Sequence, residues 1–111
     1  MSGGVEKRRH VRLPVIAEIQ YVANSPPITA RISDISSSGI FIDTVNALDL
    51  GTTVKFKMFL PPEISETPIV GAGVVAWRQP MLGMGLRFTH MSKADSERIT
   101  SYVNRVAESS R

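Results

Sequence analysis

The chain has no cysteine among its 111 residues. Without thiols it can form no disulfide framework, no thiolate nucleophile and no zinc–thiolate site. The lack of disulfides is compatible with a reducing compartment such as the cytosol. Function classes that depend on cysteine chemistry are therefore excluded.

Long apolar segments are also missing. No stretch approaches the roughly 20 residues needed to span a membrane, and the N-terminus lacks the apolar core of a signal peptide. We therefore expect a soluble intracellular protein without membrane insertion.

Aromatic residues and positive charge are too sparse for a nucleic-acid groove. The chain has one tryptophan, two tyrosines and four phenylalanines. Residues 1–12 hold four basic residues and one acidic residue, and the other nine basic and nine acidic residues cancel, so the whole +3 charge lies in this segment. Nucleic acid requires a broad basic surface, whereas a compact anion requires only a local one. The charge distribution favours a small anionic ligand and no nucleic-acid partner.

Signatures of catalysis are absent as well. His10 and His90 lack metal-ligand spacing, no Gly-x-Ser-x-Gly elbow is present, and Asp34 and Asp43 show no sign of a paired-carboxylate site. Residues 71–76 match Gly-x-Gly-x-x-Ala, but they lead into a strand pattern, and no acidic residue follows through Ser92. We expect no enzyme, no metal and no cofactor.

Alternating apolar and polar residues predict several short strands. The clearest is residues 53–60, where Val54, Phe56, Met58 and Leu60 share one face and Lys55 and Lys57 the other. Similar patterns predict strands over residues 15–22, 28–35, 40–43, 69–78 and 83–88. In the second, Ile28, Ala30 and Ile32 are in phase.

One helix is predicted at the C-terminal end. Ser92 has the character of an N-cap, with Asp95 three residues further on. Ile99, Tyr102, Val103 and Val106 then follow at helical spacing. Short antiparallel strands and a terminal helix indicate one mainly β domain, a small barrel or sandwich.

The N-terminal segment carries a cluster of guanidinium groups, Arg8-Arg9-His10-Val11-Arg12. An arginine fork can bond a phosphate bidentately, or the O6/N7 edge of guanine. In a chain rich in arginine, Arg-x-x-x-Arg alone is a weak signal.

The second motif is Asp-x-Ser-x-x-Gly at residues 34–39, in a turn between two predicted strands. The Asp34 carboxylate can only accept hydrogen bonds, which suits the N–H donors of guanine. Gly39 permits a positive φ or a close backbone approach. By itself this sequence also fits an ordinary Asp/Ser/Gly turn.

Together, in this order, the two motifs resemble those of the PilZ domain, a bacterial receptor for cyclic di-GMP. The resemblance runs from about Glu6 to the C-terminal helix. It implies a six-stranded antiparallel β-barrel with a flexible N-terminal arm and one C-terminal α-helix. The single domain of residues 1–111 would divide into a basic arm (1–12), the barrel (13–91) and the helix (92–109).

The resemblance also implies roles for individual residues. Arg8 and Arg12 would clamp phosphate and guanine, and Arg9 would assist at a phosphate or base. Asp34 would accept guanine N–H groups and Ser36 would contact base or phosphate. By the same resemblance, Gly39 would shape the turn so that the ligand can approach.

Trp77 is the candidate aromatic residue. It could pack in the core or at its rim, or it could offer a stacking platform for a purine, as a tryptophan in this strand does in some PilZ domains. Arg78 could add a cation to the same rim, although a solvated arginine is the simpler interpretation.

We therefore hypothesise a non-catalytic receptor in the bacterial cytoplasm, either a monomer or a ligand-dependent dimer. Cyclic di-GMP would order the arm over the barrel, which would change the surface met by an unidentified downstream protein. Family members of this type act in motility, surface-polymer secretion or biofilm control. The alternatives are a PilZ-fold interaction module that does not bind the nucleotide and, third, a nucleic-acid-binding barrel.

Overall fold

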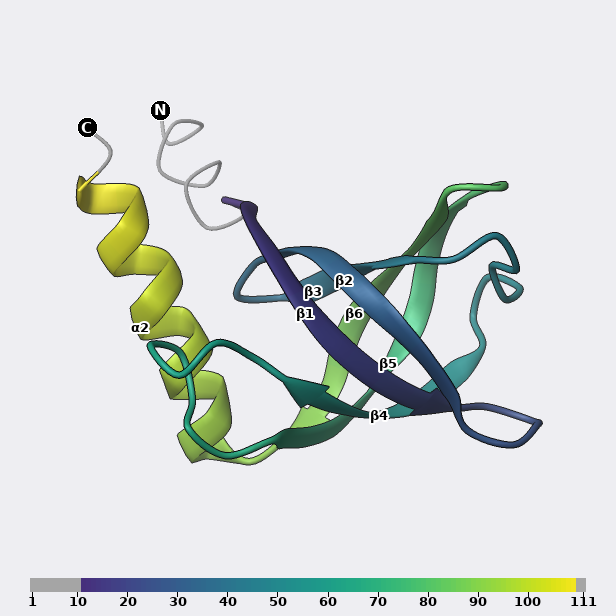
Figure 1. Ribbon diagram of the computed structural model, residues 1–111, viewed down its shortest axis with the longest axis horizontal. Coiled ribbons are helices and arrows are strands. Elements are labelled where there is room, and N and C mark those ends of the chain that lie inside the picture. The colour runs from purple at the N-terminus through teal and green to yellow at the C-terminus, as the bar shows by residue number, and fades with distance from the viewer. Residues whose placement is uncertain (1–10, 110–111) are drawn as a thin grey trace.

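The computed structural model describes residues 11–109, which form six strands and one helix (Figure 1). The strands are β1 (Leu13–Val22), β2 (Ile28–Ile35), β3 (Gly39–Asp43), β4 (Thr53–Phe59), β5 (Ile69–Gln79) and β6 (Gly83–Met91), and the helix is α2 (Lys93–Ser109). All strand pairs are antiparallel, and the sheet closes in the order β1-β2-β3-β6-β5-β4. The predicted six-stranded barrel with a C-terminal helix is confirmed.

Strand β4 shows how the barrel is built from a period of two. Val54, Phe56 and Met58 are buried, while Lys55 and Lys57 between them face solvent. Successive side chains of a strand point to opposite faces, so alternation along the sequence becomes an inside and an outside. Closure leaves this barrel without a free sheet edge.

Strand β2 follows its predicted phase only in part. Ile32 is fully buried, but Ile28 is 40% exposed, which departs from the expectation that both face the core. Ile28 is the first residue of the strand and follows the β1–β2 turn.

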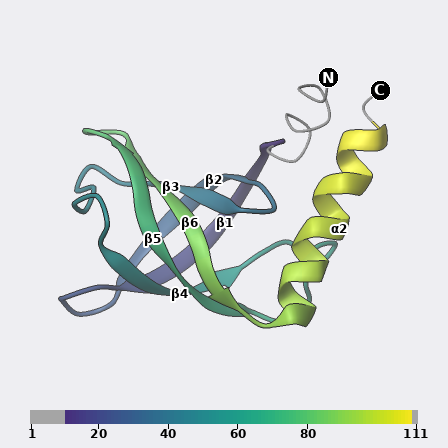
Figure 2. The same ribbon diagram turned by 180° about the vertical axis from the view of Figure 1, so that it is seen from behind.

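Helix α2 lies against one end of the barrel, and the β4–β5 connection runs beside it (Figures 1 and 2). Its predicted N-cap is confirmed, because the Asp95 amide donates to the Ser92 hydroxyl at 3.1 Å. Ile99 and Val103 are buried and attach the helix to the core. Within the described range, no helix has both the length and the apolar character to cross a membrane.

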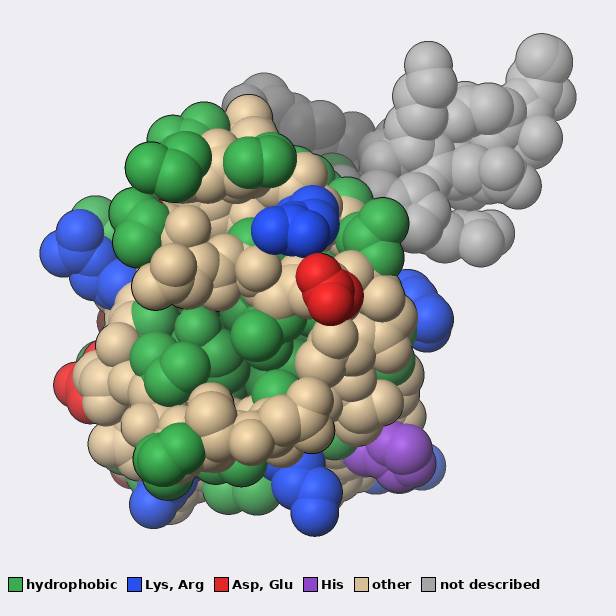
Figure 3. Space-filling model, turned by 90° about the vertical axis from the view of Figure 1, so that its right-hand side faces the viewer, with side chains coloured by type: hydrophobic (Ala, Val, Ile, Leu, Met, Phe, Trp, Pro, Cys, Tyr) green, Lys and Arg blue, Asp and Glu red, His purple; other side chains and the backbone are tan. Residues whose placement is uncertain are grey.

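The opposite end of the barrel is less well covered. Figure 3 views this end and shows apolar side chains around a shallow hollow. The β3–β4 connection and the β5–β6 turn contribute exposed apolar residues: Val45, Leu50, Met81 and Leu82. Met81 has a positive φ of 70° within a turn closed by the Leu82 amide and the Gln79 carbonyl at 2.9 Å.

The basic arm expected from the sequence falls mostly outside the described residues. Of residues 1–12, only Val11 and Arg12 are described, and Val11 packs against the barrel core. Arg8, Arg9 and His10 lie outside the described residues.

Candidate functional site

The turn between β2 and β3 is held together by Ser36. Its hydroxyl accepts hydrogen bonds from the amides of Ser38 (3.2 Å) and Gly39 (3.1 Å), and the Ser36 amide donates to the Gly39 carbonyl at 2.9 Å. Ser36 is 1% exposed. A buried hydroxyl that satisfies two backbone donors stabilises the turn in which it lies. Ser36 therefore acts on the site through the shape of this turn.

Gly39 is required by close strand packing. A Cβ at this position would lie 2.1 Å from the Leu86 carbonyl oxygen on β6. Positive φ is not the reason, since among the glycines of residues 11–109 that geometry belongs to Gly51. Of the two possibilities the sequence left open, the structure shows close backbone approach.

A β-bulge brings Asp34 to the outer face of the barrel. The register of β2 against β3 shifts between Ile32 and Asp34, and Ile35 is again fully buried. Unbroken alternation would place Asp34 on the same face as Ile32. The bulge instead directs the carboxylate to the outside, as bulges near functional sites often do.

Arg12 and Asp34, one from each motif, are bonded to each other. Arg12 Nη2 donates to Asp34 Oδ1 at 3.0 Å across 22 residues of sequence. Both side chains remain accessible, at 40% and 31% exposure. Pro14 is the register partner of Asp34, which places the start of β1 and the end of β2 side by side.

A second bulge brings Trp77 outside the barrel. The register of β5 against β6 shifts between Val75 and Trp77. Val75 is buried, and Trp77, two residues further on, is 43% exposed. Trp77 therefore does not pack in the core, and its indole is available on the outer surface.

The indole of Trp77 rests on a glycine and against a phenylalanine. A Cβ on Gly85 would lie 2.1 Å from Trp77 Nε1 and 2.6 Å from two of its ring carbons. The Phe41 ring centroid is 5.1 Å from that of Trp77, tilted by 35°. These contacts set the position of the indole while leaving part of it accessible.

Cross-strand pairing places these residues in one row around the barrel. Asp34 pairs with Phe41, Phe41 with Gly85, and Gly85 with Trp77. Strands lie about 4.8 Å apart, so three steps separate the backbone of Asp34 from that of Trp77 by about 14 Å. The row therefore offers a carboxylate at one end and an aromatic surface at the other.

Three predicted site residues line one cleft of about 170 Å³: Arg12, Gly39 and Trp77. Asp34 is joined to this cleft through its bond to Arg12. Ser36 does not line the cleft, but it holds the Ser38–Gly39 backbone that does. Residues separated by 65 positions in sequence thus share one surface.

Arg78 does not join this cleft. Its guanidinium bonds the Asp49 carboxylate at 3.5 Å and the Ala47 carbonyl at 3.2 Å. These contacts attach β5 to the β3–β4 connection and leave Arg78 with a structural role.

Three further residues lie at the site that the two sequence motifs do not include: Phe41, Gly85 and Arg87. Phe41 could have been found, because it lies between two inward-facing isoleucines and must face outwards. No local sequence pattern identifies Gly85 and Arg87, since they reach the site only because β6 pairs with β3 and β5.

The described residues contain no cluster that resembles a metal centre. Among residues 11–109, no three histidine, aspartate or glutamate side chains gather as ligands. The described histidine, His90, bonds its neighbour Thr89 at 3.2 Å.

Comparisons with known proteins agree with this architecture. The family model described as "PilZ domain" matches residues 6–105, which include both motifs. The solved structure of the Bacillus subtilis inhibitor of motility (MotI/DgrA) is similar, with a TM-score of 0.78 and 20% sequence identity. That match covers 93% of this chain and 52% of the other, so the chain spans about half the length of its structural neighbour. No curated protein matches.

Proposed function

The chain belongs to the PilZ domain family, and from that membership we propose that it binds cyclic di-GMP without catalysing a reaction. The ligand would bind to the outer barrel face formed by β2, β3, β5 and β6. The signal would pass to a downstream protein in the bacterial cytoplasm.

The observation that carries this proposal is the shared cleft. Arg12, Gly39 and Trp77 come from three separate parts of the sequence, yet they line one surface. Asp34 is bonded to Arg12 at its edge. A guanidinium, a carboxylate and an accessible indole are the groups needed to recognise a guanine nucleotide.

The Arg12–Asp34 pair can recognise guanine as a unit. Arg12 has five N–H donors, of which the ion pair uses one, and Asp34 retains a second oxygen. The guanidinium would donate to O6 and N7, while the carboxylate would accept from the N–H groups of the same base. The pair would hold both groups in position before the ligand arrives.

Trp77 would contact a different part of the ligand. The backbones of Asp34 and Trp77 are three strands apart, so the carboxylate and the indole lie towards opposite ends of the row. A ligand with two guanines can engage both ends of the row. Base stacking on an aromatic side chain is worth about 1–3 kcal/mol.

Arg8 and Arg9 would complete the site from the arm. The four basic residues and one acidic residue of positions 1–12 give that segment a charge of +3. Two ligand phosphates would neutralise most of it, and bidentate arginine–phosphate bonds would hold the arm over the barrel. The resulting change of surface is the signal that a partner protein would detect.

Calorimetric titration with cyclic di-GMP tests the proposal. The decisive variant is Arg8→Ala/Arg12→Ala, and the matched control is Arg98→Ala/Arg105→Ala, which removes the same charge from α2. We expect saturable binding in the wild type and the control, and none in the decisive variant. The single tryptophan supplies a second readout, because its emission should change on binding.

The absence of heat and of any change in Trp77 emission in the wild type would overturn the proposal. The chain would then be a PilZ-fold interaction module that acts without the nucleotide. Equal loss of binding in both double variants would point to non-specific charge attraction, and would also reject the proposed site.

A further inference from the structure

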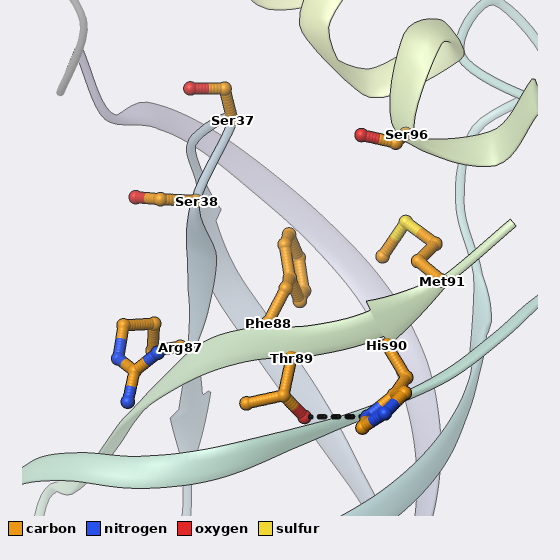
Figure 4. Close-up of a pocket in the computed structure, with 8 residues that line it drawn as sticks. All are labelled: Ser37, Ser38, Arg87, Phe88, Thr89, His90, Met91 and Ser96. Atoms are coloured by element: carbon orange, nitrogen blue, oxygen red, sulfur yellow. Dashed lines mark hydrogen bonds between the residues drawn. The ribbon is translucent and has the colours of Figure 1, made fainter. Parts of the chain in front are cut away.

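A second cavity adjoins the Trp77 cleft. It has a volume of about 390 Å³ and lies between the β2–β3 turn, the end of β6 and the start of α2 (Figure 4). Ser38 and Arg87 line both this cavity and the Trp77 cleft. The two are therefore neighbours on one surface and share a wall.

The lining of this cavity combines hydroxyl groups with the apolar side chains of Phe88 and Met91, and it lacks negative charge. Hydroxyl groups come from three different elements: Ser37 and Ser38 from the turn, Thr89 from β6 and Ser96 from α2. His90 lies beside Thr89, to which it is bonded (Figure 4). No carboxylate lines the cavity. Hydroxyl donors and acceptors without a repelling charge suit a phosphate, a ribose or the edge of a base.

Arg87 stands between the two cavities with its guanidinium available. Within residues 11–109, Arg12 bonds Asp34 and Arg78 bonds Asp49, but no described side chain forms an ion pair with Arg87. Its pairing partner on β3 is Gly39, which has no side chain to cover it. An exposed arginine with no ion-pair partner among these residues, beside hydroxyl groups, is well placed to bond a phosphate.

Size supports the use of both cavities by one type of ligand. Sites for small molecules commonly measure about 300–1,000 Å³. The second cavity, at about 390 Å³, falls within that range by itself. The Trp77 cleft, at about 170 Å³, falls below the range and reaches it only together with its neighbour.

We propose that the hydroxyl-lined cavity is a second nucleotide subsite, and that Arg87 binds a phosphate between it and the Trp77 cleft. This inference rests on the proposed binding of cyclic di-GMP. The subsite would take a guanylate unit, meaning a phosphate, its ribose and its base. That unit is either the second half of one cyclic di-GMP molecule or part of a second molecule.

Two substitutions test the subsite, each with a matched control. Arg87→Ala removes the phosphate ligand, and Arg31→Ala removes the same charge from the outer face of β2, away from both cavities. Ser96→Leu fills the cavity from an exposed helix position, and Ser101→Leu makes the same change on another face of α2, outside this cavity. All four positions are exposed, so the variants should fold.

We expect Arg87→Ala to weaken cyclic di-GMP binding about 10- to 100-fold in calorimetry, the usual range for a charge-assisted bond. Arg87→Lys, which keeps the charge but loses the fork, should lose less. Ser96→Leu should weaken binding at unchanged stoichiometry if one molecule spans both subsites. If a second molecule occupies the cavity, stoichiometry should fall from two to one. Both controls should stay within twofold of the wild type.

Both Arg87→Ala and Ser96→Leu must change cyclic di-GMP binding for the inference to stand. If either Arg87→Ala or Ser96→Leu binds with the affinity and the stoichiometry of the wild type, the inference is overturned, even where Arg12→Ala weakens binding. Failure of the proposed function has a different signature, because the wild type itself would then show neither heat nor a change in Trp77 emission.

Discussion

Strands β4 and β5 are neighbours in the same barrel, yet the alternation of inward and outward side chains is regular in β4 and interrupted in β5. In β4 the period of two is unbroken, with every second residue buried. In β5 a register shift after Val75 interrupts the period and turns Trp77 outwards. Strand β2 contains a similar shift, which turns Asp34 outwards. Regular alternation builds the core, and its local interruption exposes the groups that can bind a ligand.

The largest effect should come from breaking the regular strand. Met58 on β4 is fully buried, so Met58→Ala should lower the free energy of unfolding by about 2–5 kcal/mol. Urea unfolding measures this change. Lys57→Ala, one residue away and facing solvent, should change it by less than about 0.5 kcal/mol. Equal losses of stability at the two positions would contradict the assignment of Met58 to the core and Lys57 to the solvent face of β4.

The next effect concerns two arginine–aspartate pairs. Arg12 is paired with Asp34 across the site, and Arg98 is paired with Asp95 within one turn of α2. Arg12→Ala should weaken cyclic di-GMP binding about 10- to 100-fold, and Arg98→Ala should leave it within twofold. Because both pairs are partly exposed, each substitution should change unfolding stability by less than about 1 kcal/mol.

Calorimetry of the two single variants, beside their urea unfolding curves, separates these contributions. A loss of affinity in Arg12→Ala that merely follows a loss of stability would contradict a direct role in binding. So would similar affinities for the two variants.

A smaller change should follow from disturbing the support beneath Trp77. Gly85→Ala places a Cβ where the indole now lies, so the ring must move away from β6 and into solvent. We expect a red-shifted Trp77 emission and an affinity about three- to tenfold weaker, since part of a stacking energy of about 1–3 kcal/mol is lost.

Gly51→Ala is the informative comparison for this variant. Gly51 has open space around it but a φ of 83°, so the alanine should cost about 1 kcal/mol of stability without altering emission or affinity. A Gly85→Ala protein with unchanged emission would mean that the indole is not held by this contact.

The smallest effect is expected at the β5–β6 turn. Met81 has a φ of 70°, a conformation that side chains disfavour, and it is exposed. Met81→Gly should raise the free energy of unfolding by about 0.5–1 kcal/mol, with ligand affinity unchanged. Thermal unfolding would detect the gain as a rise in Tm, and a loss of stability would show that Met81 makes contacts that outweigh its backbone strain.

Much of the fold could be predicted from local patterns. The alternation in residues 53–60 and the cap at Ser92 each depend on neighbours in sequence, and both are confirmed. Strand ends were less accurate. Strand β1 begins at Leu13, two residues before the predicted start, and β6 continues to Met91, three residues beyond the predicted end. Pairing with a neighbouring strand decides such ends, and that pairing is not visible locally.

The candidate site was predicted where it is a local motif and missed where it is not. Asp34, Ser36 and Gly39 form one short turn, so their spacing singled them out once the arginine motif stood beside it in the sequence. Arg87 carries no such mark, and it enters the site only because β6 pairs with β3 and places it beside Gly39.

The sequence by itself determined the mainly β class, the terminal helix and the two polar motifs, because burial of every second residue and short turn motifs act over a few positions. Only the tertiary structure decided that Asp34 and Trp77 face outwards in one row. The two bulges depend on how β2 and β5 register with their partner strands once the barrel closes. A register is a non-local property, since a shift of one residue reverses the face of every side chain beyond it.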